Sequence, residues 1–436
     1  MQKYATILSA LRIDELNEMQ LASIEANQQS DNVILLSNTG SGKTLGFLIP
    51  ILERLDKNIP GTQALIVAPS RELAMQIEKV WKQMTTGFKI TCCYGGHLRE
   101  TEENNLLEAP ALIVGTPGRL GDHIRRENIK TAGITTLVLD EFDKSLELGF
   151  QDEMEFIIES LPNLKKRILT SATEAVEIPD FVGLEEPAKL NFLTEGKSEA
   201  LTLKYVDSED KDKVDTLFRL ICHLGSRPTI VFCNHREAVE RTNGLLKEKG
   251  LTSVFYHGAM EQQERDAALC KFRNGTSNIL VTTDLAARGL DIPHIRYIIH
   301  YHLPHNVETF THRNGRTARM DASGTAILLI GPDEKLPEYI NEEVELMTVP
   351  DNVELPEKPK WTTFFIGAGK KDKVNKVDIV GFLTNKGQLK KDDIGLIEVK
   401  DFFSFVAIRK SKAAVTLPLI QGQKIKNKKV KMDIAK

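Results

Sequence analysis

The chain has 436 residues, of which 41% are hydrophobic and 27% are charged, and this composition excludes a disordered, collagen-like or membrane-embedded protein. At roughly 150 residues per domain, the length predicts about three domains. The net charge of −4 is unevenly distributed, because residues 361–436 carry 17 basic and 7 acidic side chains. A basic tail therefore follows an acidic body.

The N-terminal 16 residues contain no apolar core of signal-peptide length, and the chain has no run of about 18 apolar residues. We therefore expect a cytoplasmic protein that does not contact a membrane. The five cysteines show neither zinc-site nor disulfide-framework spacing, so we expect them to be reduced and buried.

Short β-branched runs alternate with helical stretches in the first half of the chain, at residues 33–37, 64–68, 111–115, 136–140 and 167–171. Continuous apolar strands between helices are typical of a parallel sheet that is covered on both faces. The same pattern starts again at residues 229–233, 253–257, 278–283, 297–301 and 325–330. The sequence therefore predicts two α/β domains, with the polar segment 191–200 as the linker between them.

The segment SNTGSGKT lies directly between the strand at 33–37 and a helix. Small residues there let backbone N–H groups close around phosphates at a helix N-terminus. We expect Lys43 to reach the β and γ phosphates of a nucleotide and the Thr44 hydroxyl to ligate Mg²⁺. The predicted nucleotide contacts are Asn38, Thr39, Gly40, Ser41, Gly42, Lys43 and Thr44.

A carboxylate pair follows the strand at 136–140, where a phosphate-binding loop needs a metal-holding acid. Asp140 is the candidate metal ligand, and Glu141 can orient and deprotonate the attacking water. In isolation these acids would more commonly be an acidic helix start. The phosphate-binding loop favours the catalytic interpretation.

The segment HRNGRTAR, residues 312–319, offers positive charge for a γ-phosphate. Arg316 and Arg319 are three residues apart, so on one helical turn they would share a face and could act as arginine fingers. Without the nucleotide motifs, such a run would more often be a solvated basic face.

Residues 331–360 hold five of the 17 prolines and nine acidic residues, so we interpret them as a partly ordered connector. Five further apolar segments follow in about 75 residues. They predict strands or strand–helix pairs of a small α+β domain, at residues 362–367, 377–383, 394–399, 402–409 and 430–435.

Taken together, residues 1–345 resemble a DEAD-box ATP-dependent RNA helicase with two RecA-like domains, because many of the family's motifs occur in its order. The resemblance implies that Gln20 reads adenine and that Asp291 contacts the ATP ribose. It implies domains at 1–195 and 201–345, a connector at 346–360 and a third domain at 361–436. The implied fold class is α/β, with two tandem RecA-like parallel-sheet domains and a small α+β domain.

The resemblance also assigns RNA-backbone and coupling residues. The coupling residues would be Ser171 and Thr173 of the SAT motif, with Asp143 and His312 as partners. Contacts to sugar and phosphate imply little sequence preference in the helicase core. The implied RNA contacts are Arg71, Gly96, Thr116, Pro117, Gly118, Arg119, Gly258, Arg265 and Thr283.

Three departures from the family pattern stand out. Phe142 occupies the position where Ala is usual in the DEAD motif, and its bulk is expected to alter packing beside the coupling motif. Asn314 and Ala318 replace residues that are often Ile and Gly. His302 stands where Asp is usual, in either an RNA-cleft or an interdomain contact.

The tail resembles the RRM-like RNA-binding domain of the DbpA subgroup of bacterial DEAD-box proteins. Phe403 and Phe405 alternate along a strand, where they would either stack on RNA bases or pack in the core. The predicted phosphate contacts of the tail are Lys428, Lys429 and Lys431, within a cluster that includes Lys424 and Lys426. A solvated strand edge is the other interpretation of this cluster.

The leading hypothesis is an RNA-stimulated ATPase that uses Mg²⁺ and unwinds short duplexes locally as a monomer. The tail would bind structured RNA, with ribosomal RNA and a pre-ribosomal particle of the large subunit as the implied partners. One alternative is an ATP-gated RNA clamp or chaperone with weak or no unwinding. Another is a DNA helicase, which Gln20 and the RNA-type tail disfavour.

Overall fold

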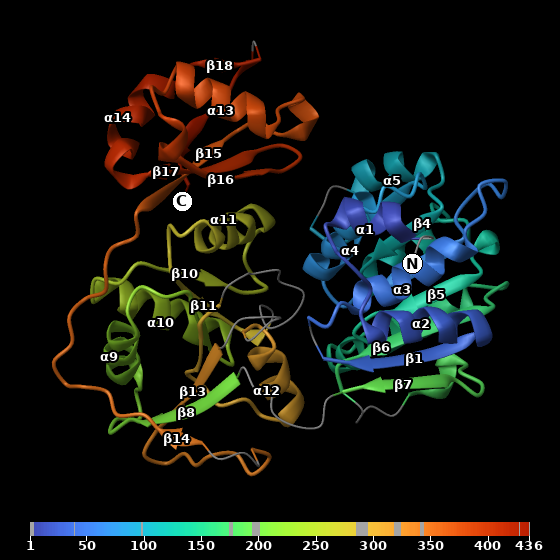
Figure 1. Ribbon diagram of the computed structural model, residues 1–436, viewed down its shortest axis with the longest axis horizontal. Helices are drawn as coiled ribbons and strands as arrows, with labels where there is room; N and C mark the ends of the chain where they lie inside the picture. The colour runs from blue at the N-terminus through green and yellow to red at the C-terminus, as the bar shows by residue number, and fades with distance from the viewer. Residues whose placement is uncertain are drawn as a thin grey trace. The chain divides into compact units, whose positions relative to one another are not determined.

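The computed structural model describes residues 4–38, 40–96, 99–173, 178–193, 201–284, 295–317, 324–340, 344–426 and 428–435. These residues form two compact units, the first from α1 to β7 and the second from β8 to β20 (Figure 1). Among the helices that the structure describes, none is long and apolar enough to cross a membrane.

The first unit is built on a seven-stranded parallel sheet with the order β3-β4-β2-β5-β6-β1-β7. Its central strands are apolar and buried, as expected where helices cover both faces. The strands are β1 (Asn32–Ser37), β2 (Ala64–Val67), β3 (Ile90–Cys93), β4 (Leu112–Gly115), β5 (Thr136–Leu139), β6 (Lys166–Ser171) and β7 (Ala188–Phe192). The helices are α1 (Ala5–Leu11), α2 (Glu18–Gln29), α3 (Lys43–Arg54), α4 (Arg71–Gln83), α5 (Arg99–Leu107), α6 (Pro117–Arg125), α7 (Phe142–Glu147) and α8 (Gln151–Glu159).

Each strand predicted for the first half is present, so the parallel-sheet prediction is confirmed. The predicted linker at 191–200 was wrong at its start, because Asn191 and Phe192 belong to β7 and lie opposite Leu36 and Ser37 of β1. The reason is that β7 is an edge strand with partly buried and exposed residues, so its sequence lacks the apolar run of an inner strand.

The second unit begins with another seven-stranded parallel sheet, in the order β10-β11-β9-β12-β13-β8-β14. Its strands are β8 (Leu201–Asp207), β9 (Thr229–Phe232), β10 (Ser253–Tyr256), β11 (Ile279–Thr282), β12 (Tyr297–His300), β13 (Gly324–Ile330) and β14 (Glu345–Leu346). Its helices are α9 (Val214–Leu224), α10 (Arg236–Glu248), α11 (Gln262–Arg273) and α12 (Val307–Asn314). This sheet confirms the second predicted α/β region.

The proline-rich segment after β13 follows the surface of this sheet domain. Its short strand β14 extends the sheet beside β8, and Met347, Val349 and Val353 pack against the buried core. Apolar side chains spaced along an otherwise polar segment therefore hold it in place.

The C-terminal domain is a four-stranded antiparallel sheet, in the order β16-β17-β15-β20, with two helices and a two-stranded hairpin. The helices are α13 (Lys376–Asn385) and α14 (Lys410–Ile420). The strands are β15 (Trp361–Ile366), β16 (Ile394–Val399), β17 (Ser404–Arg409), β18 (Lys424–Ile425), β19 (Lys428–Lys429) and β20 (Met432–Ile434). The predicted small α+β domain is confirmed.

Candidate nucleotide and RNA sites

The phosphate-binding loop of the first unit connects β1 to α3. Gly40 and Gly42 have φ angles of +86° and +89°, which only glycine adopts without strain. The N-cap of α3 is Gly42, which has no side chain to cap the helix, so the first helical N–H groups are suited to an anion. Thr39 lies outside the described residues.

Three side chains from α2 and its N-cap contact this loop and helix α3. The Asn17 amide donates to the carbonyl of Ser41 at 2.9 Å, and the Gln20 amide donates to the carbonyl of Gly42 at 3.1 Å. The Ser23 hydroxyl donates to the carbonyl of Gly46 at 2.8 Å. Gln20 is therefore buried against the loop, whereas Asn17 and Ser23 were not predicted. The signal for Asn17 in the sequence was the capping box that it forms with Gln20.

The Lys43 ammonium lies at the carboxyl edge of the sheet. It donates to the carbonyl of Ser37 at the end of β1 at 2.5 Å, and to that of Ser171 at the end of β6 at 3.4 Å. The side chain is thus held over the edge where a bound phosphate would lie, because parallel sheets bind ligands at the carboxyl ends of their strands.

Asp140 follows β5 at the same edge of the sheet. Its Oδ1 accepts a hydrogen bond from the Thr170 hydroxyl at 2.5 Å and another from the backbone N–H of Glu141 at 3.1 Å. Burial, with the adjacent Glu141 charge, raises the pKa of Asp140 to about 6. Thr170 was missed by the sequence analysis, because a threonine within a strand usually indicates β-propensity.

Glu141 occupies a strained position beside Asp140. Its φ is +46°, and its buried Oε2 has no hydrogen-bond partner among the described residues. A non-glycine residue in this region costs on the order of 1 kcal/mol or more, and such strain is concentrated at functional sites. The Asp140 carboxylate fits a divalent cation, because a cation would offset both the burial and the Glu141 repulsion that raise the pKa of Asp140.

The SAT segment contacts α7, as the family pattern implied. The Thr173 hydroxyl donates to Asp143 Oδ2 at 3.1 Å, and the Ser171 hydroxyl donates to the carbonyl of Thr173 at 2.6 Å. Phe142 is buried in the core of the first unit with Leu139. The Phe142 ring is therefore accommodated in the hydrophobic core of the first unit.

The predicted RNA motifs of the first unit converge at the ends of β2, β3 and β4. Gly96 has a φ of +83°, and a Cβ atom there would overlap the guanidinium of Arg71. Arg119 lies in the first turn of α6, where Pro117 is the first helical residue and Thr116 the N-cap. Its guanidinium donates to the buried carboxylate of Glu102 at 2.8 Å. Glu102 was not predicted, because it lies in an acidic run that resembles a solvated helix.

In the second unit, the predicted arginine fingers are only partly described. Arg316 is buried, and Arg319 and Asp291 lie outside the described residues. Helix α12 ends at Asn314, so Arg316 follows the helix and the predicted helical turn is wrong at this residue. The helix ends at this point because Gly315 has a low helix propensity and serves as the C-cap.

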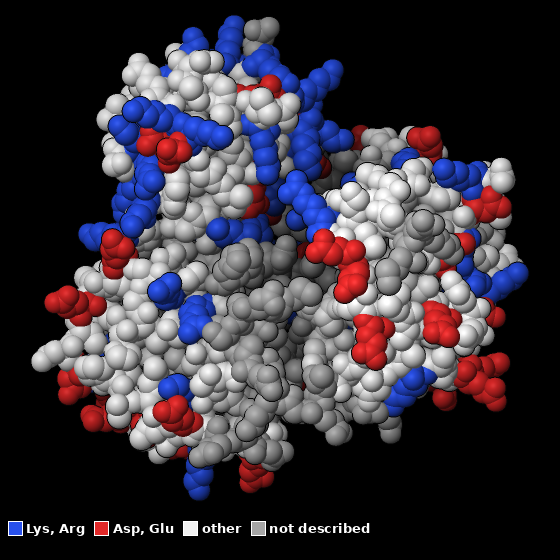
Figure 2. Space-filling model, in the orientation of Figure 1, with Lys and Arg blue, Asp and Glu red and all other residues white. Residues whose placement is uncertain are grey.

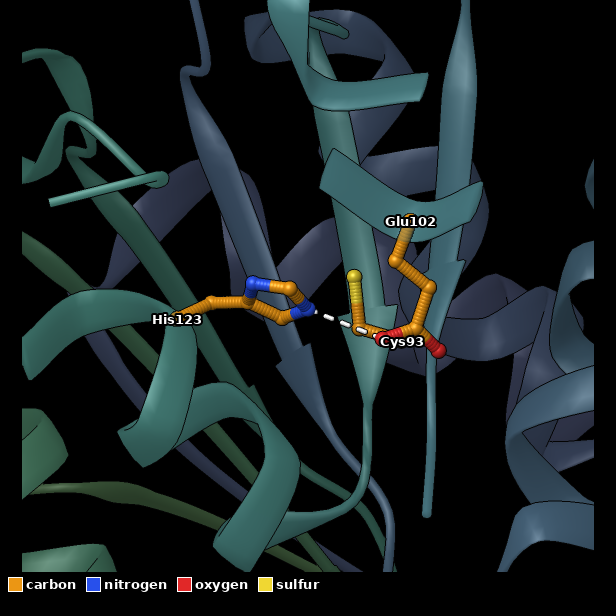
Figure 3. A group of neighbouring side chains, drawn as sticks. All are labelled: Cys93, Glu102 and His123. Carbon is orange, nitrogen blue, oxygen red and sulfur yellow. Dashed lines mark hydrogen bonds and ion pairs between the residues drawn. The ribbon is translucent and has the colours of Figure 1, made fainter. Parts of the chain in front are cut away.

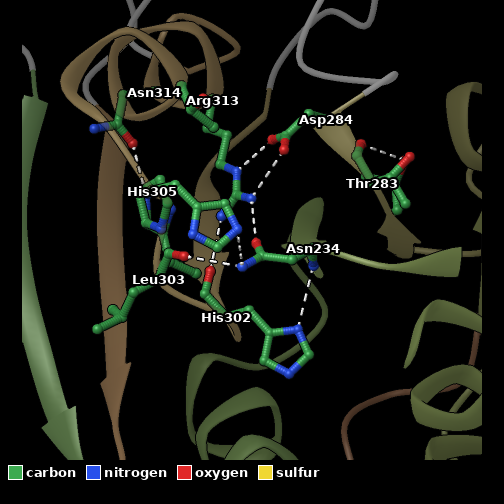
Figure 4. Close-up of polar contacts among 12 residues, drawn as sticks. Asn234, Thr283, Asp284, His302, Leu303, His305, Arg313 and Asn314 are labelled. Carbon is green, nitrogen blue, oxygen red and sulfur yellow. Dashed lines mark hydrogen bonds and ion pairs between the residues drawn. The ribbon is translucent and has the colours of Figure 1, made fainter. Parts of the chain in front are cut away.

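Arg313 organises the surroundings of α12, although the sequence analysis did not single it out. Its Nε donates to Asp284 Oδ1 at 2.6 Å, and its Nη2 donates to Asn234 Oδ1 at 2.8 Å. Its Nη1 donates to the carbonyl of His302 at 2.8 Å (Figure 4). Arg313 therefore joins the segments that contain Asn234, Asp284 and His302. In the sequence, its position between His312 and Arg316 was the feature that could have identified it.

Two of the departing residues in this region, His302 and Asn314, have structural partners, and Ala318 lies outside the described residues. His302 Nδ1 accepts a hydrogen bond from the backbone N–H of Asn234 at 3.2 Å, and burial lowers the pKa of His302 to about 4. Asn314 Oδ1 lies 3.0 Å from Nε2 of the buried His300. His302 thus supports the segment after β9, and Asn314 ties the end of α12 to β12.

The second set of predicted RNA contacts lies around the N-terminus of α11. Arg265 is buried and donates to the carbonyls of Gly258 and Met260. Its guanidinium therefore shapes the Gly258 turn in this structure. The carbonyl of Thr283 accepts a hydrogen bond from the Thr282 hydroxyl at 3.0 Å.

The aromatic face of the C-terminal sheet packs against α11. Phe405 is 1% exposed and lies in one apolar cluster with Ala267 and Cys270 of that helix, with Phe365 and Phe403 beside it. Of the two predicted roles for Phe405, packing is therefore observed. Base stacking is wrong for this residue, because α11 covers its ring.

Polar contacts surround this cluster. Arg273 of α11 forms two hydrogen bonds with Glu398 of β16, each at 2.8 Å. Lys400 pairs with Asp266 at 3.0 Å, and the Thr363 hydroxyl accepts from the Asn274 amide at 2.8 Å. We call these residues, with the aromatic cluster, the α11 dock.

The predicted lysine cluster lies on the hairpin β18–β19 and next to it. Lys426 pairs with Asp378 at 2.8 Å, and Lys428 pairs with Asp372. Lys424, Lys429 and Lys431 are exposed. Figure 2 shows lysine and arginine side chains gathered over the C-terminal domain, in agreement with its excess of basic residues. This surface is suited to phosphate groups.

Comparisons with known proteins match three parts of the chain. Residues 17–181 match the DEAD/DEAH box helicase family, residues 212–321 match the helicase conserved C-terminal domain, and residues 363–434 match the DbpA RNA binding domain.

Curated relatives cover nearly the whole chain. The chain is 31% identical over 449 residues to the ATP-dependent RNA helicase DbpA of Escherichia coli, covering 99% of this chain and 98% of that protein. It is 30% identical over 467 residues to DbpA of Bacillus subtilis, covering 98% and 96%. It is also 35% identical over 344 residues to the helicase eIF4A of Aspergillus oryzae, covering 76% and 81%.

Solved structures show the same likeness for the two parallel-sheet domains. S. cerevisiae Dbp5 bound to RNA and ADP BeF3 has a TM-score of 0.66 and 28% identity, covering 75% of this chain and 86% of that one. The DEAD-box helicase Mss116 bound to ssRNA and UDP-BeF has a TM-score of 0.67 and 27% identity, covering 76% and 73%.

Proposed function

This chain belongs to the DEAD-box family of ATP-dependent RNA helicases, and we propose that it couples ATP hydrolysis to local unwinding of ribosomal RNA during assembly of the large ribosomal subunit. RNA-stimulated ATPase activity is common to the family, which includes the curated relatives. The proposal adds the RNA target and the roles of individual residues.

The catalytic assignment rests on Oε2 of Glu141, which is buried beside Asp140 at the carboxyl edge of β5 and has no hydrogen-bond partner in the part of the chain that the structure describes. A carboxylate oxygen in this position can accept a hydrogen bond from a water and orient it for attack. In this assignment Glu141 is the general base, and Lys43 binds the β and γ phosphates.

Asp140 and Thr44 are the residues that would hold Mg²⁺. When bound, the ion would neutralise the charge that develops on the phosphate oxygens. The chain's own contribution is the hydrogen bond from Thr170, which orients the Asp140 carboxylate toward the same edge as Lys43. Arg316 and Arg319 are proposed to add positive charge at the γ-phosphate.

Ribosomal RNA is proposed as the target because the relatives that span the whole chain are DbpA helicases and because the third domain matches their RNA-binding domain. Its exposed lysines would supply salt-sensitive contacts to phosphates. Because α11 covers Phe405, RNA binding is assigned to the lysine-bearing surface around β18 and β19.

Steady-state ATPase assays with and without RNA test the catalytic assignment. Lys43→Ala and Glu141→Gln should each lower RNA-stimulated turnover by at least about 100-fold. Glu159→Gln, at an exposed residue at the end of α8, is the matched control and should retain turnover. Stimulated turnover in Glu141→Gln at the wild-type rate would contradict the assignment.

The RNA target is tested by crosslinking and sequencing of bound cellular RNA. The full-length protein should enrich large-subunit ribosomal RNA, and a Lys424→Gln, Lys429→Gln, Lys431→Gln variant should lose that enrichment. Identical profiles for the two proteins would show that this lysine surface does not direct targeting.

The alternative is an ATP-gated RNA clamp without productive unwinding. It predicts ATP-dependent retention of RNA with negligible duplex separation, so a strand-displacement assay distinguishes the two functions. Comparing RNA with DNA as activators of the ATPase separates both from a DNA helicase.

A further inference from the structure

Glu102 is a fully buried carboxylate on α5 that the proposed catalytic steps do not use. Its Oε1 accepts a hydrogen bond from the backbone N–H of Tyr94 at 2.9 Å. Its Oε2 lies 2.8 Å from Nη1 of Arg119 and 2.8 Å from Nε2 of His123. One carboxylate thus joins the end of β3 to helix α6 (Figure 3).

A metal site is the first interpretation to weigh, because donor atoms of Cys93, Glu102 and His123 lie within 4.8 Å of one another. The Asn128 amide nitrogen lies 3.0 Å from His123 Nδ1, so Nδ1 accepts and Nε2 carries the proton that points to Glu102. Burial raises the pKa of the Cys93 thiol well above its usual range, which keeps the sulfur protonated.

The Arg119 guanidinium beside the same carboxylate oxygen would also repel a metal cation. The group is therefore a hydrogen-bond network in which two donors saturate Oε2 of Glu102.

The segments that Glu102 joins are both assigned to RNA. The N–H of Tyr94 immediately precedes Gly95 and Gly96, and Arg119 belongs to the TPGR motif. Arg71 of a third predicted RNA motif packs against Gly96. Glu102 therefore lies beneath a surface that three separate loops form at adjacent strand ends.

We propose that Glu102 is a positioning residue for RNA, which holds Arg119 and the Gly95–Gly96 turn in the arrangement that receives the phosphates of one RNA strand. The inference rests on the proposed function, because it deepens the RNA site of the first unit.

The physical reason is preorganisation. An arginine side chain loses rotamer entropy when it binds a phosphate, and a guanidinium already fixed by a carboxylate loses less. Arg119 retains 15% of its side-chain exposure, whereas Glu102 retains 1%. The negative charge is thus shielded by protein, while the Arg119 side chain remains partly exposed to solvent.

Glu102→Gln tests the proposal, because the amide places N–H donors against Arg119 and His123 in nearly the same volume. The RNA concentration for half-maximal ATPase stimulation should rise by about tenfold, and this change should exceed the change in rate at saturating RNA. Glu100→Gln, at an exposed residue of the same helix, is the matched control and should leave both quantities unchanged.

A double-mutant cycle with Arg119→Ala shows whether Glu102 acts through the arginine. Arg119→Ala should weaken RNA activation, and adding Glu102→Gln to it should weaken activation by less than it does in the wild type. Fully additive effects would overturn the proposal. A fall in the unfolding temperature of Glu102→Gln with an unchanged half-saturating RNA concentration would also overturn it, in favour of a purely structural role.

RNA-stimulated turnover of the wild-type protein shows whether a failure concerns this proposal or the proposed function. If the wild type shows no RNA-stimulated turnover, the proposed function fails. If it is stimulated and Glu102→Gln matches Glu100→Gln, the positioning role alone fails.

Discussion

The Gln20 side chain donates to the backbone carbonyl of Gly42, and the same amide would lie 2.5 Å from a Cβ atom placed on that glycine. Helix α2 and the phosphate-binding loop are therefore packed without room for a methyl group. The Gln20 amide therefore helps to hold the loop in its conformation.

Gly42→Ala is expected to abolish RNA-stimulated ATPase activity. The φ of +89° costs an alanine on the order of 1–2 kcal/mol, and the added methyl displaces Gln20. A shift of about 1 Å in the loop would reduce turnover about 100-fold. Turnover measured at saturating ATP and RNA checks this expectation.

Gly61→Ala is the matched control, since Gly61 has a φ of +94° and a Cβ there meets no atom within 4 Å. It should lose a similar amount of stability and retain ATPase activity. If both variants lose activity equally, backbone strain alone explains the effect and the contact with Gln20 is irrelevant.

Asp140→Asn is expected to stabilise the fold at neutral pH while it removes catalysis. The pKa of Asp140 is raised from 3.8 to about 6, so the folded chain binds this proton more tightly than the unfolded chain. Stability from this residue is therefore present below about pH 4 and is lost as the pH rises to about 6. At pH 7 the ionised group costs on the order of 2–3 kcal/mol.

Urea unfolding of the two proteins at pH 7 measures this difference. Asp14→Asn changes an exposed carboxylate and should leave the midpoint unchanged. An Asp140→Asn midpoint at or below that of the wild type at neutral pH would show that the carboxylate is not destabilised in the fold.

Arg273→Glu is expected to open the α11 dock. The substitution replaces two hydrogen bonds of 2.8 Å with a repulsion between carboxylates, which costs about 2–5 kcal/mol. Glu398→Arg should also weaken the dock, and combining the two substitutions should restore it. The restoration should be only partial, because Lys400 Nζ lies 3.6 Å from the Glu398 carboxylate and would repel an arginine at that position. Energy transfer between dyes on α9 and α14 reports the separation of the two domains.

Lys247→Glu, on α10, controls for charge reversal within the same sheet domain and should leave the energy transfer unchanged. Energy transfer in Arg273→Glu equal to that of the wild type would mean that the apolar cluster around Phe405 holds the dock without the ion pair.

Asp372→Asn is expected to strengthen RNA binding by the full-length protein. Asp372 pairs with Lys428, and this ion pair lowers the pKa of the carboxyl, so the lysine is partly neutralised near pH 7. Asparagine keeps the acceptor for the backbone N–H of Gly369 and releases the lysine. Affinity should rise about two- to threefold at 0.1 M salt, with a smaller gain at higher salt.

Titrations with a fluorescent structured RNA measure the change. Asp392→Asn removes the same charge from an exposed residue of the same domain and is the control. An equal gain in both variants would indicate a general effect of net charge, which contradicts a specific role for Lys428.

Much of this protein could be predicted from local sequence patterns. A β-branched run followed by Gly-rich residues and a helix places Lys43, and an apolar run that ends in two acids places Asp140 and Glu141. Such patterns are readable because the residues that define them are neighbours in the chain, and strand and helix periods repeat every two or about four residues.

Contacts between distant segments could not be read in the same way. Glu102 belongs to an acidic run typical of a solvated helix, yet the fold buries it against Arg119 of the next helix. Phe405 has the alternation of an RNA-stacking strand, yet α11 covers it. A periodic pattern shows that a side chain lies on a face, but what covers that face depends on the packing of segments far apart in sequence. The burial of a charge or a ring is consequently a property of the assembled fold.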